Sequence, residues 1–187
     1  QGLENDSKKY VDLILKNLEK MDALISGILN YSTLEREQLA KQKIDLNILL
    51  QEILLSIYIP THIEVQLQEN LPVITGDPIR IQQLFQNILQ NAIKSIDKEK
   101  GIVKINFIEN RNGEWQFSIQ DNGCGIPSHQ FEKIFKIFEK IDDNHSSTGI
   151  GLSIVKKIID FYEGQIWLES ELNKGTTFYF TLPKISA

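Results

Sequence analysis

Three polar side chains share one face of a predicted helix in the middle of the chain. Asn87, Asn91 and Lys94 are spaced four and three residues apart, and at about 100° per residue they occupy one narrow sector of the helix surface. Two carboxamides and an ammonium there would offer oxygen acceptors and positive charge to a ligand. A solvated surface is the alternative, because amphipathic helices usually expose a polar face.

Glycines mark two further segments. Asp121 opens the sequence Asp-Asn-Gly-Cys-Gly, which by itself is a common turn sequence. Gly149 and Gly151 lead directly into a helix with periodic apolar residues, so unpaired N–H groups and the positive end of the helix dipole face whatever lies there. Such a helix start favours an anion, although a glycine pair alone is a weak signal.

The helix that carries the three polar residues is predicted from Asp77 to Asp97. The Asp77 carboxylate can cap the first backbone N–H groups, and Pro78 fits the first turn. Its apolar residues recur at helical spacing and form one wide stripe that would lie on a core; they are Ile81, Leu84, Phe85, Ile88, Leu89, Ala92, Ile93 and Ile96.

Four segments in order make these signals specific. They are 121–127 (DNGCGIP), 134–140 (IFKIFEK), 148–152 (TGIGL) and 174–178 (KGTTF). With the helix before them, they resemble the ATP-binding domain of two-component sensor histidine kinases, within the wider superfamily of gyrase-type topoisomerases, ATP-driven chaperones and mismatch-repair ATPases. The resemblance extends from about Asp45 to Pro183.

The resemblance implies an adenine pocket at the Asp121 turn. Asp121 would accept a hydrogen bond from the exocyclic amine of adenine, whereas guanine, with a carbonyl at that position, would be repelled. Gly123 and Gly125 would let the backbone approach the base closely, and Ile126 follows them. Thr176 is similar to the hydroxyl that completes the pocket, and otherwise is an ordinary strand residue.

The resemblance also implies phosphate and metal positions. Asn91 would offer its side-chain oxygen to Mg²⁺. Lys94 and Lys140 would act as catalytic residues by adding positive charge at the phosphates, and Lys140 is otherwise a solvated lysine. The family often has glycine at the position of Ser147. The triphosphate would bind at Thr148, Gly149, Ile150, Gly151 and Leu152.

Asn87, also expected to contact the nucleotide, bears on the type of reaction. It occupies the position where hydrolysing relatives carry a glutamate that activates water as a general base. A carboxamide cannot take that proton, so slow hydrolysis and transfer to a protein acceptor are predicted. Ser95, where many kinases of the family have tyrosine, is a second departure from the family pattern.

Phe135 and Phe138 resemble the aromatic residues beside the ATP lid and are also expected to anchor the core.

The first part of the chain has a different pattern. Apolar residues at 11, 14, 18, 21, 25 and 28 alternate steps of three and four, as in a coiled-coil or bundle seam, and also as in an ordinary amphipathic helix. The segment resembles the second helix of the kinase dimerisation hairpin. His62, His129 and His145 do not fit the family's phosphoacceptor box, so the acceptor is expected outside this chain. We assign residues 1–40 to this hairpin and 41–187 to the ATP-binding catalytic domain.

The predicted fold class is α/β (α+β). It is a two-layer sandwich, a mixed sheet with three helices on one face, preceded by a long coiled-coil-like helix and a linker at Glu35–Lys43. Asn112-Gly113 favours a tight hairpin turn, and Gly164 ends a helix. Helices are expected at 46–57, 77–97 and 151–162, and strands at 63–67, 73–75, 103–107, 115–119, 165–169 and 176–182.

Composition narrows the function further. The 187 residues carry a formal net charge of -5 without a lysine or arginine cluster, which argues against a nucleic-acid partner. No apolar run is long enough to span a bilayer, so no membrane contact and a cytoplasmic location are expected, with any anchor elsewhere in the parent protein. Cys124 is the single cysteine, which excludes an internal disulfide. Because the first residue is Gln1, the chain is expected to be part of a longer protein.

The expected function is therefore that of a sensor histidine kinase's catalytic part. ATP with Mg²⁺ would bind, and the γ-phosphoryl group would pass to a histidine on a dimerisation helix absent from this chain, for onward transfer to a response regulator. The parent protein is expected to be a homodimer. The alternative is a nucleotide-gated dimerisation or partner-docking module without phosphotransfer.

Overall fold

The computed structural model describes residues 41–139 and 149–184. It also describes seven positions nearer the N-terminus, which are helical and between 52% and 66% exposed: Tyr10, Val11, Ile14, Leu15, Leu18, Met21 and Ile25. The rest of the predicted coiled-coil-like helix lies outside the described residues. No helix among the described residues is long and apolar enough to cross a bilayer.

Five strands form the main sheet in the order β2-β4-β5-β7-β6. The first pair is parallel and the other three pairs are antiparallel, which confirms the predicted mixed sheet. The strands are β2 (Ile63–Leu67), β4 (Gly101–Glu109), β5 (Trp115–Asp121), β6 (Ile166–Glu171) and β7 (Gly175–Leu182).

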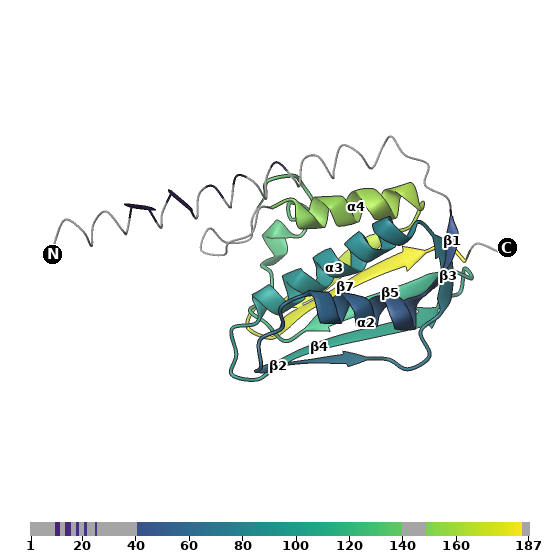
Figure 1. Cartoon of the computed structure of the whole chain (residues 1–187), viewed down its shortest axis with the longest axis horizontal. Helices are drawn as coiled ribbons and strands as arrows, with labels where there is room; N and C mark the ends of the chain where they lie inside the picture. The colour runs from purple at the N-terminus through teal and green to yellow at the C-terminus, as the bar shows by residue number, and fades with distance from the viewer. Residues whose placement is uncertain are drawn as a thin grey trace.

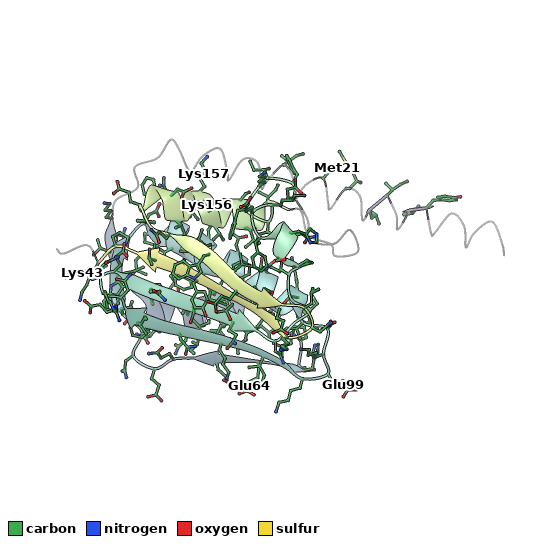
Figure 2. All side chains as sticks on the ribbon, turned by 180° about the vertical axis from the view of Figure 1, so that it is seen from behind. Met21, Lys43, Glu64, Glu99, Lys156 and Lys157 are labelled. Carbon is green, nitrogen blue, oxygen red and sulfur yellow. The ribbon has the colours of Figure 1, made fainter. Side chains whose placement is uncertain are left out.

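Three helices cover one face of this sheet, as predicted. They are α2 (Leu46–Ser56), α3 (Pro78–Ser95) and α4 (Gly151–Phe161), and Figure 1 shows them lying side by side over the strands. The view from behind in Figure 2 has the strands in front of the helices. The described part of the chain from residue 41 onward is therefore a two-layer sandwich.

Helix α3 is the centre of the core. Asp77 accepts a hydrogen bond from the backbone N–H of Ile79 and Pro78 occupies the first turn, so the helix begins as its sequence predicts. All eight residues of its apolar stripe are at most 9% exposed. The Phe85 ring packs edge-on against Phe117 of β5 and Phe180 of β7, with 5.5 Å between ring centroids in each pair. The helix is thereby fixed over the two central strands.

A second, two-stranded sheet was missed by sequence reasoning. β1 (Gln42–Asp45) pairs antiparallel with β3 (Val73–Gly76), where a single sheet was expected and the linker was extended to Lys43. β1 has one buried residue, Ile44, so it shows no apolar alternation from which a strand could be predicted. Its partner lies about thirty residues further along the chain, a distance over which local patterns carry no information.

Two turns also differ from expectation. β4 ends at Glu109 and β5 begins at Trp115, so the connection is longer than a tight two-residue turn. The Asn110 side-chain oxygen accepts hydrogen bonds from the N–H groups of Asn112 and Glu114, which stabilises the longer loop. After α4, the residue in the left-handed region is Glu163, with φ of 56°, not Gly164.

The core position of Phe85 yields a stability prediction. Phe85→Ala should lower the free energy of unfolding by about 3–5 kcal/mol, because the substitution removes a fully buried ring and leaves a cavity. Urea unfolding followed by circular dichroism measures this change. Leu55→Ala on α2 is the control, since Leu55 is 89% exposed and its truncation should change stability by less than about 0.5 kcal/mol. Equal effects of the two substitutions would contradict this account of the core.

Candidate functional site

Helix α3 presents its polar face toward the start of α4. Asn87 and Asn91 are partly buried and Lys94 is exposed. The Asn87 side-chain N–H₂ donates to the carbonyl oxygen of Gln83 at 2.8 Å, which leaves the Asn87 side-chain oxygen directed away from that bond. A Cβ atom added to Gly151 would lie 2.9 Å from this oxygen. The start of α4 therefore lies close to the Asn87 side chain, and a larger residue at position 151 would require that side chain to move.

The N-terminus of α4 has N–H groups without a side-chain cap. Ile150 stands at the N-cap position and forms no capping hydrogen bond, because its side chain has no acceptor. Gly149 precedes it with φ of +70°, and its carbonyl oxygen accepts from the N–H of Phe138 at 3.0 Å. The helix therefore begins without a side-chain acceptor for its first N–H groups, and the anion site predicted here stays a prediction. Thr148 and Lys140, the other two residues predicted here, lie outside the described residues.

The Asp121 turn packs against the other end of α3. The Cys124 N–H donates to the Ser95 carbonyl oxygen at 2.9 Å, and a Cβ atom on Gly123 would lie 2.4 Å from that oxygen. Gly125 has φ of +74°, and a Cβ there would lie 2.3 Å from the carbonyl oxygen of Glu171. Both glycines are therefore required by close approach to the backbone of other segments, whereas the predicted approach to a base stays a prediction.

The Asp121 carboxylate is buried and held by the backbone. It is 3% exposed, and one of its oxygens accepts from the N–H of Gly123 at 2.8 Å and from the N–H of Thr176 at 3.3 Å. Burial raises the pKa of Asp121 above its ordinary value of 3.8, opposed by the hydrogen bonds from Gly123, Ser95 and Thr176 and by the charge of Lys98. Its other oxygen forms neither of these two backbone hydrogen bonds.

Thr176 donates its N–H to Asp121, and Ser170 links Thr176 to Ile126. The hydroxyl oxygens of Ser170 and Thr176 are 2.9 Å apart, and the Ser170 hydroxyl oxygen accepts from the Ile126 N–H at 2.7 Å. These residues border a hollow of about 300 Å³. Sequence reasoning missed Ser170 because the strand was predicted to end at Glu169. The lining residues are Gln120, Asp121, Glu169, Ser170, Glu171, Lys174, Gly175, Thr176 and Thr177.

Three predicted site residues have apolar side chains that are buried or partly buried: Ile126, Ile150 and Leu152. Ile126 and Ile150 are 4% and 2% exposed, so their side chains belong to the core and only their backbones can face a ligand. Leu152 is partly buried on α4.

The expectation that both phenylalanines anchor the core was right for Phe135, which packs against Phe178, and wrong for Phe138, which is 55% exposed.

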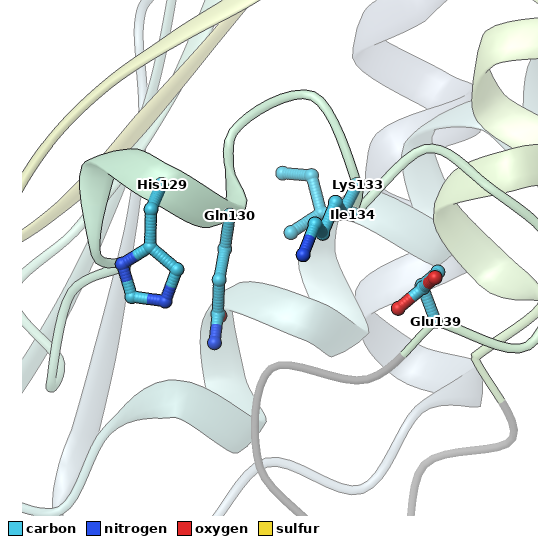
Figure 3. Close-up of a pocket in the computed structure, with 5 residues that line it drawn as sticks. All are labelled: His129, Gln130, Lys133, Ile134 and Glu139. Atoms are coloured by element: carbon cyan, nitrogen blue, oxygen red, sulfur yellow. The ribbon is translucent and has the colours of Figure 1, made fainter.

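A smaller pocket of about 120 Å³ contains none of the predicted site residues. Figure 3 shows it beside the short turn η1 (Ser128–Gln130). The pocket is lined by His129, Gln130, Lys133, Ile134 and Glu139. The Asp121 turn contributes no residue to this lining, whereas Glu139 lies beside the start of α4, since a Cβ atom on Gly149 would be 2.7 Å from its carbonyl oxygen.

The two glycine-rich segments thus meet one helix at two points. Gly151 faces Asn87, and Gly123 faces Ser95, eight residues further along α3, which corresponds to about 12 Å along the helix axis. Asn91 lies on the turn between them. The arrangement combines a buried hydrogen-bond acceptor at one end with uncapped N–H groups at the other.

Comparison with known proteins finds a matching family model and similar relatives. A family model described as histidine kinase-, DNA gyrase B-, and HSP90-like ATPase matches residues 76–186. The phytochrome-like protein Cph1 of Synechocystis sp. is 34% identical over 189 residues, which cover 98% of this chain and 25% of that protein. The chain therefore spans about a quarter of the length of that relative.

Two solved structures are also similar to this chain. Full-length ShkA in complex with AMPPNP is similar with a TM-score of 0.76 and 25% identity, covering 96% of this chain and 39% of that chain. Histidine kinase ThkA in complex with the response regulator protein TrrA is similar with a TM-score of 0.73 and 30% identity, covering 95% of this chain and 51% of that chain.

The buried carboxylate predicts how stability depends on pH. Because burial raises the pKa of Asp121 in the folded protein, the free energy of unfolding falls as the pH rises from 3.8 through the raised value, and it stays lower above that value. Asp121→Asn removes this titration and keeps an oxygen acceptor for the Gly123 N–H. The difference in free energy of unfolding, variant minus wild type, should therefore be larger at about pH 7 than at about pH 4.

Urea unfolding of both proteins without nucleotide, at several pH values in this range, measures the difference. Identical pH dependence of the two proteins would contradict the assignment of a buried, titrating carboxylate at this position.

Proposed function

This chain belongs to the histidine kinase-, DNA gyrase B- and HSP90-like ATPases, and from this membership we propose that it is the catalytic ATP-binding part of a sensor histidine kinase. The observation that carries the proposal is the contact of both glycine-rich segments with α3, at Asn87 and at Ser95. A nucleotide bound along the helix would have its base at the Asp121 turn and its phosphates at the start of α4.

The adenine base is recognised at the Asp121 turn in this proposal. The carboxylate is acceptor-only, and one of its oxygens is held by the N–H groups of Gly123 and Thr176. In this proposal the other oxygen accepts from the exocyclic amine. The turn's glycines and the Ile126 backbone lie close to the base, and Thr176 borders it. Burial of the carboxylate strengthens discrimination, because a ligand without a donor would leave a buried charge unpaired.

The phosphates bind at the start of α4. The uncapped N–H groups of Gly149, Ile150, Gly151 and Leu152 would donate to phosphate oxygens, helped by the positive end of the helix dipole. Thr148 precedes this group, and Lys140 and Lys94 supply positive charge. Charge neutralisation and positioning account for most catalysis of phosphoryl transfer.

Asn91 is the proposed protein ligand for Mg²⁺. Among the described residues, no cluster of three or more His, Cys, Asp or Glu side chains could hold a metal ion. A single amide oxygen on α3, completed by phosphate oxygens and water, fits the ligand preferences of Mg²⁺. When bound, the ion would neutralise phosphate charge.

The acceptor is proposed to be a histidine on a dimerisation hairpin. Residues 1–40 would supply the second helix of that hairpin and residues 41–187 the catalytic domain. His62, His129 and His145 stand outside the acceptor box, so this chain alone should not phosphorylate itself. ThkA has been crystallised with a response regulator, and we propose a response regulator and a homodimeric, cytoplasmic context for the parent protein too.

Nucleotide binding by the purified chain tests the proposal. Isothermal titration should show that a non-hydrolysable ATP analogue binds with Mg²⁺ and binds more weakly without it, whereas Asp121→Asn should lose the binding. Absence of binding in the wild type would refute the proposal. Binding without transfer to a histidine-bearing hairpin supplied in trans would favour a docking module instead.

The identity of residue 87 predicts the balance between hydrolysis and transfer. The wild type should hydrolyse ATP slowly, because a carboxamide cannot act as a general base. Asn87→Glu should raise steady phosphate release by at least about tenfold, since a positioned base typically contributes more than that. Asn87→Gln is the matched control and should stay slow. Fast hydrolysis by the wild type would contradict the role given to Asn87.

A further inference from the structure

An ion pair is buried in the first turn of α3, away from the predicted site residues. Arg80 and Asp77 are each 3% exposed, and the Arg80 Nε lies 3.2 Å from a carboxylate oxygen of Asp77. Burying two charges is unfavourable unless their geometry repays the loss of hydration. A cation near the N-terminus of a helix is further disfavoured by the helix dipole. Stability alone therefore does not explain why an arginine is present here.

The arginine contacts the far end of α4. Its guanidinium carbon lies 3.9 Å from the centroid of the Phe161 ring, and Phe161 is the last residue of α4. A guanidinium stacks on an aromatic face through its planar, weakly hydrated cation. The Asp77 carboxylate lies beside this guanidinium and balances its charge. The ion pair therefore links the first turn of α3 to the last turn of α4.

The residue after Phe161 is held by the same turn. The backbone N–H of Asp77 donates to the Tyr162 hydroxyl oxygen at 2.8 Å, and Tyr162 is 6% exposed. A Cβ on Gly76 would lie 3.0 Å from that hydroxyl, so glycine leaves the space that the tyrosine needs. Asp77 and Arg80 together thus contact two consecutive residues at the end of α4.

These contacts determine where α4 lies along α3. Its buried residues, among them Ile154 and Ile158, interdigitate with the core and hold it there, and contacts at its two ends add to this packing. At one end Gly151 lies close to Asn87, and at the other Phe161 stacks on Arg80 and Tyr162 accepts from the Asp77 N–H. Because a helix is a stiff rod with a fixed rise per residue, a constraint at Phe161 also determines the position of Gly151.

We propose that Arg80 is a positioning residue for the phosphate-binding end of α4, acting through its contact with the Phe161 ring. The inference rests on the proposed function, because it concerns the same nucleotide site. Arg80 does not touch the nucleotide. It holds the helix whose N–H groups do.

Two nucleotides separate positioning from general stability. AMPPNP needs both the Asp121 turn and the start of α4, whereas AMP lacks the β- and γ-phosphates and depends chiefly on the turn. Arg80→Met and Arg80→Lys should each weaken AMPPNP binding by about tenfold, the upper range of coupling through a packed element, and change AMP binding, followed by NMR titration, by less than about twofold. Loss of the planar stacking group predicts that lysine does not rescue the effect.

Lys156→Met is the matched control. Lys156 also lies on α4 and pairs with Asp160, but both side chains are about half exposed, so its removal should leave AMPPNP binding unchanged. Phe161→Leu alters the same contact from the α4 side at a half-exposed position, and keeps the test available if an Arg80 variant does not fold. It should weaken AMPPNP binding, and the double variant with Arg80→Met should lose little more than either single variant.

The results distinguish this inference from the proposed function. Equal weakening of AMP and AMPPNP by the Arg80 variants, or a lower melting temperature with unchanged AMPPNP binding, would overturn the positioning role. Unchanged AMPPNP binding by Phe161→Leu would overturn it as well. Failure of the wild type to bind either nucleotide would instead refute the proposed function.

Discussion

Burial of the apolar stripe of α3 is the interaction on which the rest of the structure depends. Phe85 packs edge-on against Phe117 and Phe180, which are themselves stacked with 5.2 Å between ring centroids. These rings fix the rotation of the helix about its own axis. Since Asn87 and Asn91 lie on the other side of the same helix, the aromatic core also determines where their amides point. Stability and site geometry therefore depend on the same 18 residues.

The glycines of the site are explained by how closely backbones approach this helix and each other. Gly123 lies against Ser95, Gly151 against Asn87, and Gly175 against the carbonyl oxygen of Asp121. A side chain at Gly123 or Gly175 would clash with backbone atoms and separate the two segments, whereas one at Gly151 would displace only the Asn87 side chain. The glycine-rich composition of the site thus follows from packing as well as from the need to admit a ligand.

Periodicity was sufficient to predict α3, α4 and the central strands, because their buried residues repeat at the spacing of the element. It failed for β1, which has one buried residue, and for Phe138, whose sequence context does not reveal its exposure. Ser170 and Arg80 were missed because their importance comes from partners distant in sequence: Ser170 joins Thr176 to Ile126, and Arg80 meets Phe161. The glycine motifs and Asp121 were recognisable through family resemblance, since each alone is ordinary turn chemistry.

The hydrogen bond from the Phe138 N–H to the Gly149 carbonyl oxygen has a consequence for how the domain can diversify. It brings together two points eleven residues apart in sequence, so the ends of the intervening segment are already closed by the fold. The entropic cost of closing a loop grows only with the logarithm of its length, about 0.6 kcal/mol for each doubling. Insertions between these two residues would therefore cost little stability and leave the start of α4 where it is. The chain between these two residues can thus vary in length and sequence while the described scaffold remains constant.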